Sequence, residues 1–268
     1  MDKLSRPSLT SFEGMIWNAN HVLSYALDPG IRGIPKGYFM GCAGVVLMSS
    51  IQAGFMLSGS VGTGIFLKRD SEGNWSNPVA CGMAAVGVGF QIGATSKDVI
   101  IFLPNDASVQ TFFSSGVTLG AHSDVTIGVG RDLEGAVGVS GSGMAPIISI
   151  AYTKGAFVGA SMEGALISPR KGANEAFYGA GNGDPEAIIE GKVKFPAHKI
   201  TMNEELKEKL QKLSMGMTEK IGEAELKKAE QAAAEADKAA ATLQTTAASD
   251  IVELEDGRKV GATAANQA

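Results

Sequence analysis

Glycine density is the feature of this sequence that most constrains its fold. The chain has 268 residues and 35 glycines, and 29 of the glycines lie between Gly30 and Gly183. In that region short apolar runs alternate with turn-forming residues, which is typical of β-strands. Glycine lets neighbouring backbones approach closely and lets strands bend tightly. The pattern predicts a strongly curved, mainly antiparallel, glycine-rich sheet or a partial barrel, with candidate strands at 43–48, 52–57, 63–68, 79–84, 86–93, 98–103, 124–129, 135–141, 146–152, 155–160 and 164–168.

Helices are expected before, within and after this region, so the predicted fold class is α+β. Residues 10–27 form an amphipathic pattern that begins with the capping-box sequence from Thr10 to Glu13 and ends before Pro29. A shorter helix is expected at 105–114, with Asn105 as its cap. Beyond Asn203 a long C-terminal helix is expected. Its narrow apolar stripe suits either a coiled-coil partner or docking on the domain and consists of Leu206, Leu210, Leu213, Met217 and Ile221.

These patterns divide the chain into four parts. Residues 8–183 are the predicted domain, 184–202 a linker, 203–245 a helical extension and 246–268 a disordered tail. A chain of this length is sufficient for one sizeable core and an appendage.

The charge of the chain argues against nucleic-acid binding, and its cysteines are expected to be reduced. The net charge is −5, and residues 1–200 carry 14 basic against 15 acidic side chains, which does not fit a basic nucleic-acid binder. The two cysteines, Cys42 and Cys81, lie in apolar runs and are expected to be buried and reduced. No signal segment or membrane-spanning apolar run is evident, so a cytoplasmic location is expected.

No motif of the sequence predicts catalysis. The glycines from Gly59 to Gly64 lack the lysine of a phosphate-binding loop and lead into a strand, so they are interpreted as structural. The three histidines, His21, His122 and His198, have no partner at metal-ligand spacing. We therefore expect a non-enzymatic protein with no metal and no cofactor.

Ordered sequence blocks do carry a family resemblance. They include the glycine-rich stretch from Leu57 to Gly93, then Asp98-Val-Ile-Ile-Phe-Leu, Gly128-Val-Gly-Arg131, Tyr152-Thr-Lys-Gly-Ala-Phe-Val-Gly159, Met162-Glu-Gly164 and Asn174-Glu-Ala-Phe-Tyr-Gly179. In this order and spacing they resemble the SYLF domain family, the Ysc84/SH3YL1-like lipid-binding domains. The resemblance covers roughly residues 8–180.

The resemblance implies a peripheral membrane domain that binds acidic phospholipids, notably phosphoinositides. It also implies that actin is a partner, as it is for Ysc84-type members. The candidate lipid-binding residues are Lys3, Arg6, Phe12, Ile16, Trp17, Arg32, Lys36, Lys68 and Arg69. The first helix has no basic residue between Arg6 and Arg32, so its apolar stripe is explained either by membrane contact or by packing on the sheet.

Arg131 and Glu163 are charged residues within the apolar region. A charge among such neighbours should be paired or functional. We expect both to belong to one structural polar network with Asn174 or Tyr178.

Two functions therefore stay open. The first is a membrane-associated domain that binds acidic phospholipid headgroups. The alternative is a scaffolding protein, actin-associated or self-assembling as a homo-oligomer, with a protein partner on the C-terminal helix and weak or no lipid binding.

Overall fold

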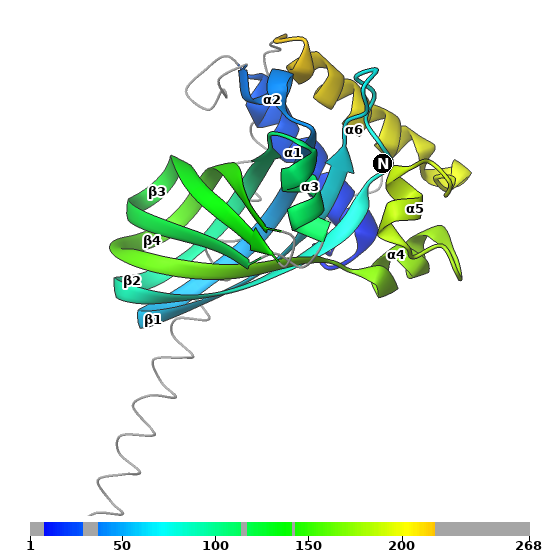
Figure 1. Ribbon diagram of the computed structural model, residues 1–268. Helices are drawn as coiled ribbons and strands as arrows, with labels where there is room; N and C mark the ends of the chain where they lie inside the picture. The colour runs from blue at the N-terminus through cyan, green and yellow to red at the C-terminus, as the bar shows by residue number, and fades with distance from the viewer. Residues whose placement is uncertain (1–7, 29–36, 114–116, 141–142, 218–268) are drawn as a thin grey trace, which may run out of the picture.

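The computed structural model describes residues 8–28, 37–113, 117–140 and 143–217. Helices gather at one end of a long, curved antiparallel sheet (Figure 1). In chain order the elements are α1 (Phe12–Leu27), α2 (Gly37–Gly41), β1 (Gly44–Lys68), β2 (Val79–Leu103), α3 (Asp106–Phe113), β3 (Val117–Ser140), β4 (Gly143–Pro169), α4 (Lys171–Tyr178), α5 (Pro185–Ile189), the 3₁₀ helix η1 (Ala197–Lys199) and α6 (Ile200–Ser214). The predicted α+β class is confirmed, with a curved antiparallel sheet, an N-terminal helix and a C-terminal helix.

The sheet consists of four long strands in the order β1-β2-β4-β3. All three neighbouring pairs are antiparallel. The short strands predicted from the sequence are segments of these four elements, so the expected strand breaks at residues 49–51, 58–62 and 94–97 are wrong. The apolar runs were located correctly, but serines and glycines between them continue the ladder instead of turning.

Strand β1 bends back on itself. A side-chain Cβ placed on Gly64 would lie 2.1 Å from the carbonyl oxygen of Leu47, although the two residues are 17 positions apart in one strand. A straight strand would separate them by about 56 Å. The Arg69 amide also donates to the Ala43 carbonyl at 2.8 Å. The β1–β2 register shifts between Phe55 and Leu57, midway along β1, which is where a bulge would bend the strand.

This bend explains the glycines that resemble a phosphate-binding loop. Gly62 and Gly64 lie inside β1 and face the first half of the same strand, where a Cβ on Gly62 would lie 2.8 Å from the Ser49 carbonyl oxygen. Only a residue without a side chain permits backbones to approach this closely. The structural interpretation of these glycines is therefore confirmed.

Helix α1 is a core element. Ser11 caps it by accepting a hydrogen bond from the Gly14 amide, one residue later than the predicted cap at Thr10. The helix packs against β1 on one side and α6 on the other. Its apolar residues are almost fully buried, including Phe12 at 4% and Ile16 at 0% exposure.

Helix α6 completes that packing. Its residues Leu206, Leu210 and Leu213 are buried against the rest of the domain. These three members of the predicted apolar stripe therefore dock on the domain. The helix begins at Ile200 and ends at Ser214, and Gly216 follows with a φ of +69° that favours glycine and ends a helix. The expected continuous helix from 203 therefore stops early, and the rest of the predicted extension and tail, from 218 onward, lies outside the described residues.

The segment predicted to be a linker also packs on the domain. Residues 184–202 contain α5, η1 and the start of α6, and both Ile188 and Val193 belong to the hydrophobic core. Among the described residues, no helix combines the length and the apolar character that crossing a bilayer requires.

The bent end of the sheet has an unusual polarity. In the second half of β1, Ser58 and Ser60 are buried, whereas Leu57 and Val61 are 63% and 66% exposed. The same alternation continues in β2, where Val86 is 69% exposed. The second half of β1 therefore turns serine side chains inward and apolar side chains outward, the reverse of an ordinary soluble sheet, and in β2 the exposed Val86 lies between the buried Ala85 and Gly87.

Candidate functional site

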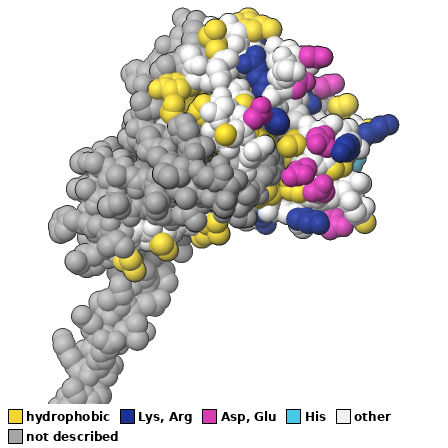
Figure 2. Space-filling view, viewed as in Figure 1, with side chains coloured by type: hydrophobic (Ala, Val, Ile, Leu, Met, Phe, Trp, Pro, Cys, Tyr) yellow, Lys and Arg dark blue, Asp and Glu magenta, His cyan; other side chains and the backbone are white. Residues whose placement is uncertain are grey.

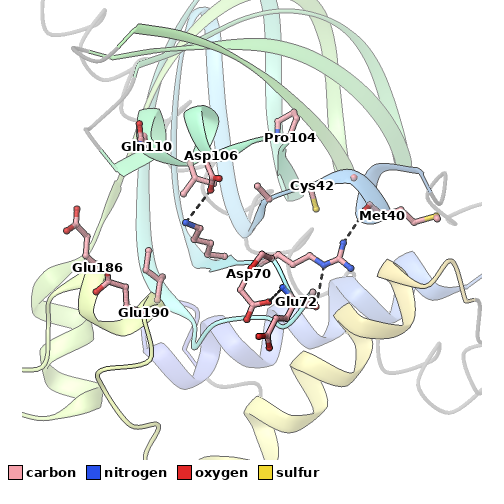
Figure 3. A pocket seen from close by; sticks show the side chains of 17 residues that line it. Met40, Cys42, Asp70, Glu72, Pro104, Asp106, Gln110, Glu186 and Glu190 are labelled. Atoms are coloured by element: carbon pink, nitrogen blue, oxygen red, sulfur yellow. Dashed lines mark hydrogen bonds and ion pairs between the residues drawn. The ribbon is translucent and has the colours of Figure 1, made fainter.

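A groove opens between the helices and the β1–β2 turn. It has a volume of about 1390 Å³ and is formed by α2, the end of β1, the turn that follows, the start of α3 and α5 (Figure 3). A smaller cavity of about 270 Å³ adjoins it and shares Lys68, Asp70, Ile189 and Glu190. We call the two together the acidic groove, because five carboxylates line the larger part: Asp70, Glu72, Asp106, Glu186 and Glu190.

The β1–β2 turn holds two of these carboxylates in place. The Asp70 carboxylate accepts hydrogen bonds from the backbone amides of Glu72 at 2.9 Å and Asn74 at 2.8 Å. These bonds, chiefly those from Asn74, lower the pKa of the Asp70 carboxyl. Gly73 adopts a φ of +89°, so the turn needs a glycine at this position. A rigid turn therefore presents Asp70 and Glu72 to the groove.

Both basic residues that line the larger part are already engaged. Lys68 forms an ion pair with Asp106 at 3.2 Å. The Arg69 guanidinium donates to the Met40 carbonyl at 3.1 Å and to the Gly73 carbonyl at 3.4 Å, and it lies 6.0 Å from the centre of the Trp75 ring. These contacts fix the walls of the groove and neutralise one of the five carboxylates.

Two further lysines come from the C-terminal segment: Lys207 lines the smaller cavity, and Lys192 contacts the groove residue Glu190. Lys192 pairs with Glu190 at 2.5 Å, and this hydrogen bond raises the pKa of Lys192. Lys207 donates to the Asn77 side chain at 3.1 Å, and burial lowers its pKa. In the described part of the chain, Asp70, Glu72 and Glu186 are left without an ion-pair cation.

One residue that lines the smaller cavity has a buried donor without a partner. Trp75 lines the smaller cavity and is only 5% exposed, and its Nε1–H has no hydrogen-bond acceptor among the described residues. Leaving such a group unpaired costs about 1–3 kcal/mol. The site therefore offers exposed negative charge and an apolar contribution from Met40 and Ile189, and the Trp75 Nε1–H lies buried behind this surface.

The structure describes five of the nine predicted lipid-binding residues. Lys3, Arg6, Arg32 and Lys36 lie outside the described residues. Phe12 and Ile16 are buried in the core, which fits the packing alternative for the first helix, while the half-buried Trp17 stacks on His21. Of the five described candidates, Lys68 and Arg69 lie together, in the acidic groove.

The structure describes only part of the predicted polar network. Asn174 Oδ1 accepts from the Ala80 amide at 2.8 Å, and the Tyr178 hydroxyl donates to the Pro78 carbonyl at 2.7 Å, so both serve the start of β2. The β3–β4 ladder pairs Arg131 with Tyr152 and Glu163 with Gly120. Eleven ladder positions separate these pairs, and the side chains of Arg131 and Glu163 lie outside the described part, so their membership of one network stays a prediction.

A second polar cluster lies beneath α1. Asn18 donates to Ser49 Oγ at 2.9 Å and to Asp98 Oδ1 at 3.3 Å, and the Ser49 hydroxyl also donates to Asp98. Asp98 is 5% exposed, so these bonds offset the cost of burying its carboxylate. The cluster anchors α1 to the sheet. The described residues contain no group of three His, Cys, Asp or Glu side chains that could hold a metal ion.

Comparison with known proteins gives the family. The family model described as "Ysc84: Las17-binding protein actin regulator" matches residues 84–213. Residues 84–213 of this chain are thus similar to the Ysc84 family. The match includes α5, which contacts β2, and most of α6, which packs on α1. The predicted recognition is confirmed.

Three relatives show how much of the chain the similarity covers. The SH3 domain-containing protein PJ696.02 of Schizosaccharomyces pombe is 34% identical over 220 residues, which is 80% of this chain and 51% of that protein. Protein YSC84 of Saccharomyces cerevisiae is 34% identical over 165 residues, 61% of this chain and 35% of its own length. The SH3 domain-containing YSC84-like protein 1 of Mus musculus is 38% identical over 147 residues, 54% of this chain and 43% of its own length. This chain therefore spans about half or less of each relative.

Among solved structures, the virulence-associated protein VapD of Rhodococcus equi matches 47% of this chain and 96% of its own length. The TM-score is 0.30 and the identity 11%, which is too little similarity to support a structural argument.

Most groove residues were not predicted from the sequence. Met40, Asp106, Glu186 and Glu190 come from three separate helices or their ends and form no motif. The one local signal was the sequence from Lys68 to Glu72, where two basic residues precede an acidic turn.

Proposed function

We propose that this chain is a non-catalytic binding protein that acts in actin regulation in the cytoplasm. The observation that carries the proposal is the match of residues 84–213 to a family described as Las17-binding actin regulators. The relatives named YSC84 and LAS seventeen-binding protein 3 of Saccharomyces cerevisiae, each 34% identical over 165 residues, support the same assignment. The partners proposed are actin filaments or a Las17-type protein.

Two measurements test this function on the full chain. Purified chain is centrifuged with actin filaments, and separately incubated with immobilised Las17. We expect saturable recovery in the filament pellet or saturable retention on Las17, with bovine serum albumin as the control protein. A chain that stays in the supernatant with filaments and also passes over Las17 without retention would refute the proposal.

We keep acidic phospholipid binding as a second candidate. The supporting observation is the reversed polarity at the bent end of the sheet, where Leu57, Val61 and Val86 are all more than 60% exposed. Exposed apolar side chains of this kind are common at membrane contacts. Lys3, Arg6, Arg32 and Lys36 remain proposed headgroup contacts, each contributing about 1 kcal/mol near an anionic surface.

Liposome flotation tests this second candidate. Vesicles of phosphatidylcholine with and without phosphatidylinositol 4,5-bisphosphate are compared for the native chain and for Val61→Ser/Val86→Ser. We expect flotation with the anionic vesicles and its loss in the double variant. Equal flotation of both proteins would exclude the sheet from the contact, and no flotation of the native chain would reject lipid binding.

A further inference from the structure

We propose that the exposed apolar face at the bent end of the sheet lies on an anionic membrane surface, with Arg170 and Lys171 at its rim as headgroup contacts. This inference rests on the second proposed function, acidic phospholipid binding. It assigns the side of the protein that meets the membrane and two residues that hold it there. The strand register, the basic rim and the size of the face each support it.

The strand register gathers the exposed apolar residues on one surface. Val61 of β1 pairs with Ala84 of β2, which pairs with Leu166 of β4, and all three are exposed. Val86 lies two residues beyond Ala84 and Leu57 four residues before Val61. Paired residues share a side of the sheet, and so do residues two apart in one strand. These five residues therefore form one surface, which we call the apolar face.

The described part of the chain leaves the apolar face uncovered. Nearer the helices the same side of β1 is fully buried, at Ile65 and Leu67. From Val61 to the bend this side is exposed at alternate residues, while Ser58 and Ser60 on the other side are buried. In Figure 2, hydrophobic side chains show along the lower edge of the sheet, where Figure 1 places β1, and charged side chains gather at the helical end.

A basic rim borders the apolar face on its helical side. A Cβ placed on Gly82 would lie 3.2 Å from Arg170 Cδ, so the Arg170 side chain lies on the same side of β2 as Ala84. Lys171 follows and is exposed. Neither cation has an ion-pair partner in the described part of the chain. Arg170 donates one N–H to the Thr10 carbonyl at 3.3 Å, which leaves further guanidinium donors for a phosphate.

The chain before Ser8 joins the structure at the same rim. The Thr63 hydroxyl, two residues from Val61, donates to the Leu9 carbonyl at 2.6 Å. Residues 1–7 therefore connect to the described chain beside the apolar face, and they contain two basic residues against one acidic residue. The five residues of the apolar face carry no charge. An apolar surface with cations at its border complements an anionic membrane.

The size of the apolar face favours a membrane over a second copy of the chain. From Leu57 to Thr63 the surface runs about 20 Å along β1, and three strands are about 10 Å wide. This footprint of roughly 200 Å² is well below the area of about 800 Å² that each partner buries in a standard protein interface. Membrane binding has no such minimum, because buried apolar area and attraction to anionic lipids act together.

Liposome flotation of the full chain tests the basic rim. Vesicles of phosphatidylcholine with phosphatidylinositol 4,5-bisphosphate are mixed with the native chain, with Arg170→Gln/Lys171→Gln, and with the control Lys192→Gln/Lys194→Gln. The control removes the same charge from exposed lysines between α5 and η1. We expect the rim variant to lower the vesicle partition coefficient by about tenfold to thirtyfold, and the control by less than about twofold. Arg170→Lys/Lys171→Arg keeps both charges and should float like the native chain.

A fluorescent label locates the bilayer. The polarity-sensitive fluorophore NBD is attached to Val86→Cys on the apolar face and to Lys194→Cys as the control, since Cys42 and Cys81 are buried. We expect the anionic vesicles to shift the emission of the Val86→Cys label to shorter wavelengths and to leave the control unchanged. Equal flotation of the rim and control variants, or an unmoved Val86→Cys emission, would overturn the inference. So would a dimer of the native chain in solution that Val61→Ser/Val86→Ser dissociates.

The outcomes separate this inference from the function on which it rests. If the native chain floats and the rim variant floats equally well, phospholipid binding stands and the assignment of Arg170 and Lys171 fails. If the native chain does not float with the anionic vesicles, phospholipid binding itself fails, and the inference with it. Neither result bears on filament co-sedimentation or Las17 retention, which test the role in actin regulation.

Discussion

Replacing Gly64 by alanine tests the bend of β1. The new Cβ would lie 2.1 Å from the Leu47 carbonyl oxygen and 2.7 Å from the Met48 Cα, and both are backbone atoms that cannot rotate away. Overpacking of this kind costs about 1–3 kcal/mol, and more where backbone has to move. We therefore expect Gly64→Ala to lower the free energy of unfolding by about 2–4 kcal/mol.

Gly59 provides the matched control. It lies five residues earlier in the same strand and is exposed, and a Cβ on it would meet nothing within 4 Å. Alanine there removes conformational freedom from the unfolded chain, so Gly59→Ala should leave stability unchanged or raise it by about 0.4–1 kcal/mol.

Urea unfolding followed by circular dichroism measures both variants. In thermal unfolding of the same two variants, a difference of 2–4 kcal/mol would appear as a gap of roughly 4–16 °C in Tm for a domain of this size. If Gly64→Ala and Gly59→Ala unfold at the same urea concentration, the two halves of β1 do not lie against each other and the folded-back strand is wrong.

Three further predictions follow from buried and paired groups. Asn174→Ala leaves the buried Ala80 amide without its acceptor and should lower the free energy of unfolding in urea by about 1–3 kcal/mol, whereas an unchanged midpoint would show that the bond contributes nothing. Glu13 bonds to Lys199, which lowers the pKa of the Glu13 carboxyl from its ordinary value of 4.5. Because the pKa of Glu13 is lowered in the folded state, the stabilisation is present above pH 4.5 and is lost as the pH falls through the folded pKa. When Tm is measured from pH 7 to pH 3, it should therefore fall more steeply in the native chain than in Glu13→Gln. Parallel Tm curves for the two proteins would contradict this prediction. Burial raises the pKa of the Cys42 thiol to about 11, so it should react with a thiol reagent at pH 8 only after unfolding, and rapid modification of the native protein would show that it is accessible.

The site was less predictable than the fold. Lys68 and Arg69 were singled out as basic residues for an anionic headgroup, yet the structure surrounds them with carboxylates. Asp106 and Glu186 are 80 residues apart in sequence and come together only because α3 and α5 both pack at the helical end of the sheet. No local pattern encodes that meeting.

Local sequence determined the elements whose causes are local. The 3–4 spacing of apolar residues defined α1 to within two residues of its start, and Asn105 marked the beginning of α3. Glycine-punctuated apolar runs identified strand-forming segments and a curved sheet, and the order of those runs identified the family. Each of these features depends on neighbours within a few positions of the chain.

Tertiary structure alone decided how those pieces were joined and which surfaces they left exposed. Whether the residues between two apolar runs turn or continue a strand depends on the ladder partner across the sheet, which for β1 is β2. The bend of β1 also depends on contact between residues 17 positions apart in the same strand. Whether the stripe on α1 meets a membrane or a core depends on α6, which lies some 180 residues later and covers it. The physical reason is that burial and pairing are properties of contacts between distant segments, and the sequence states which residues are suited to a contact without stating which contact forms.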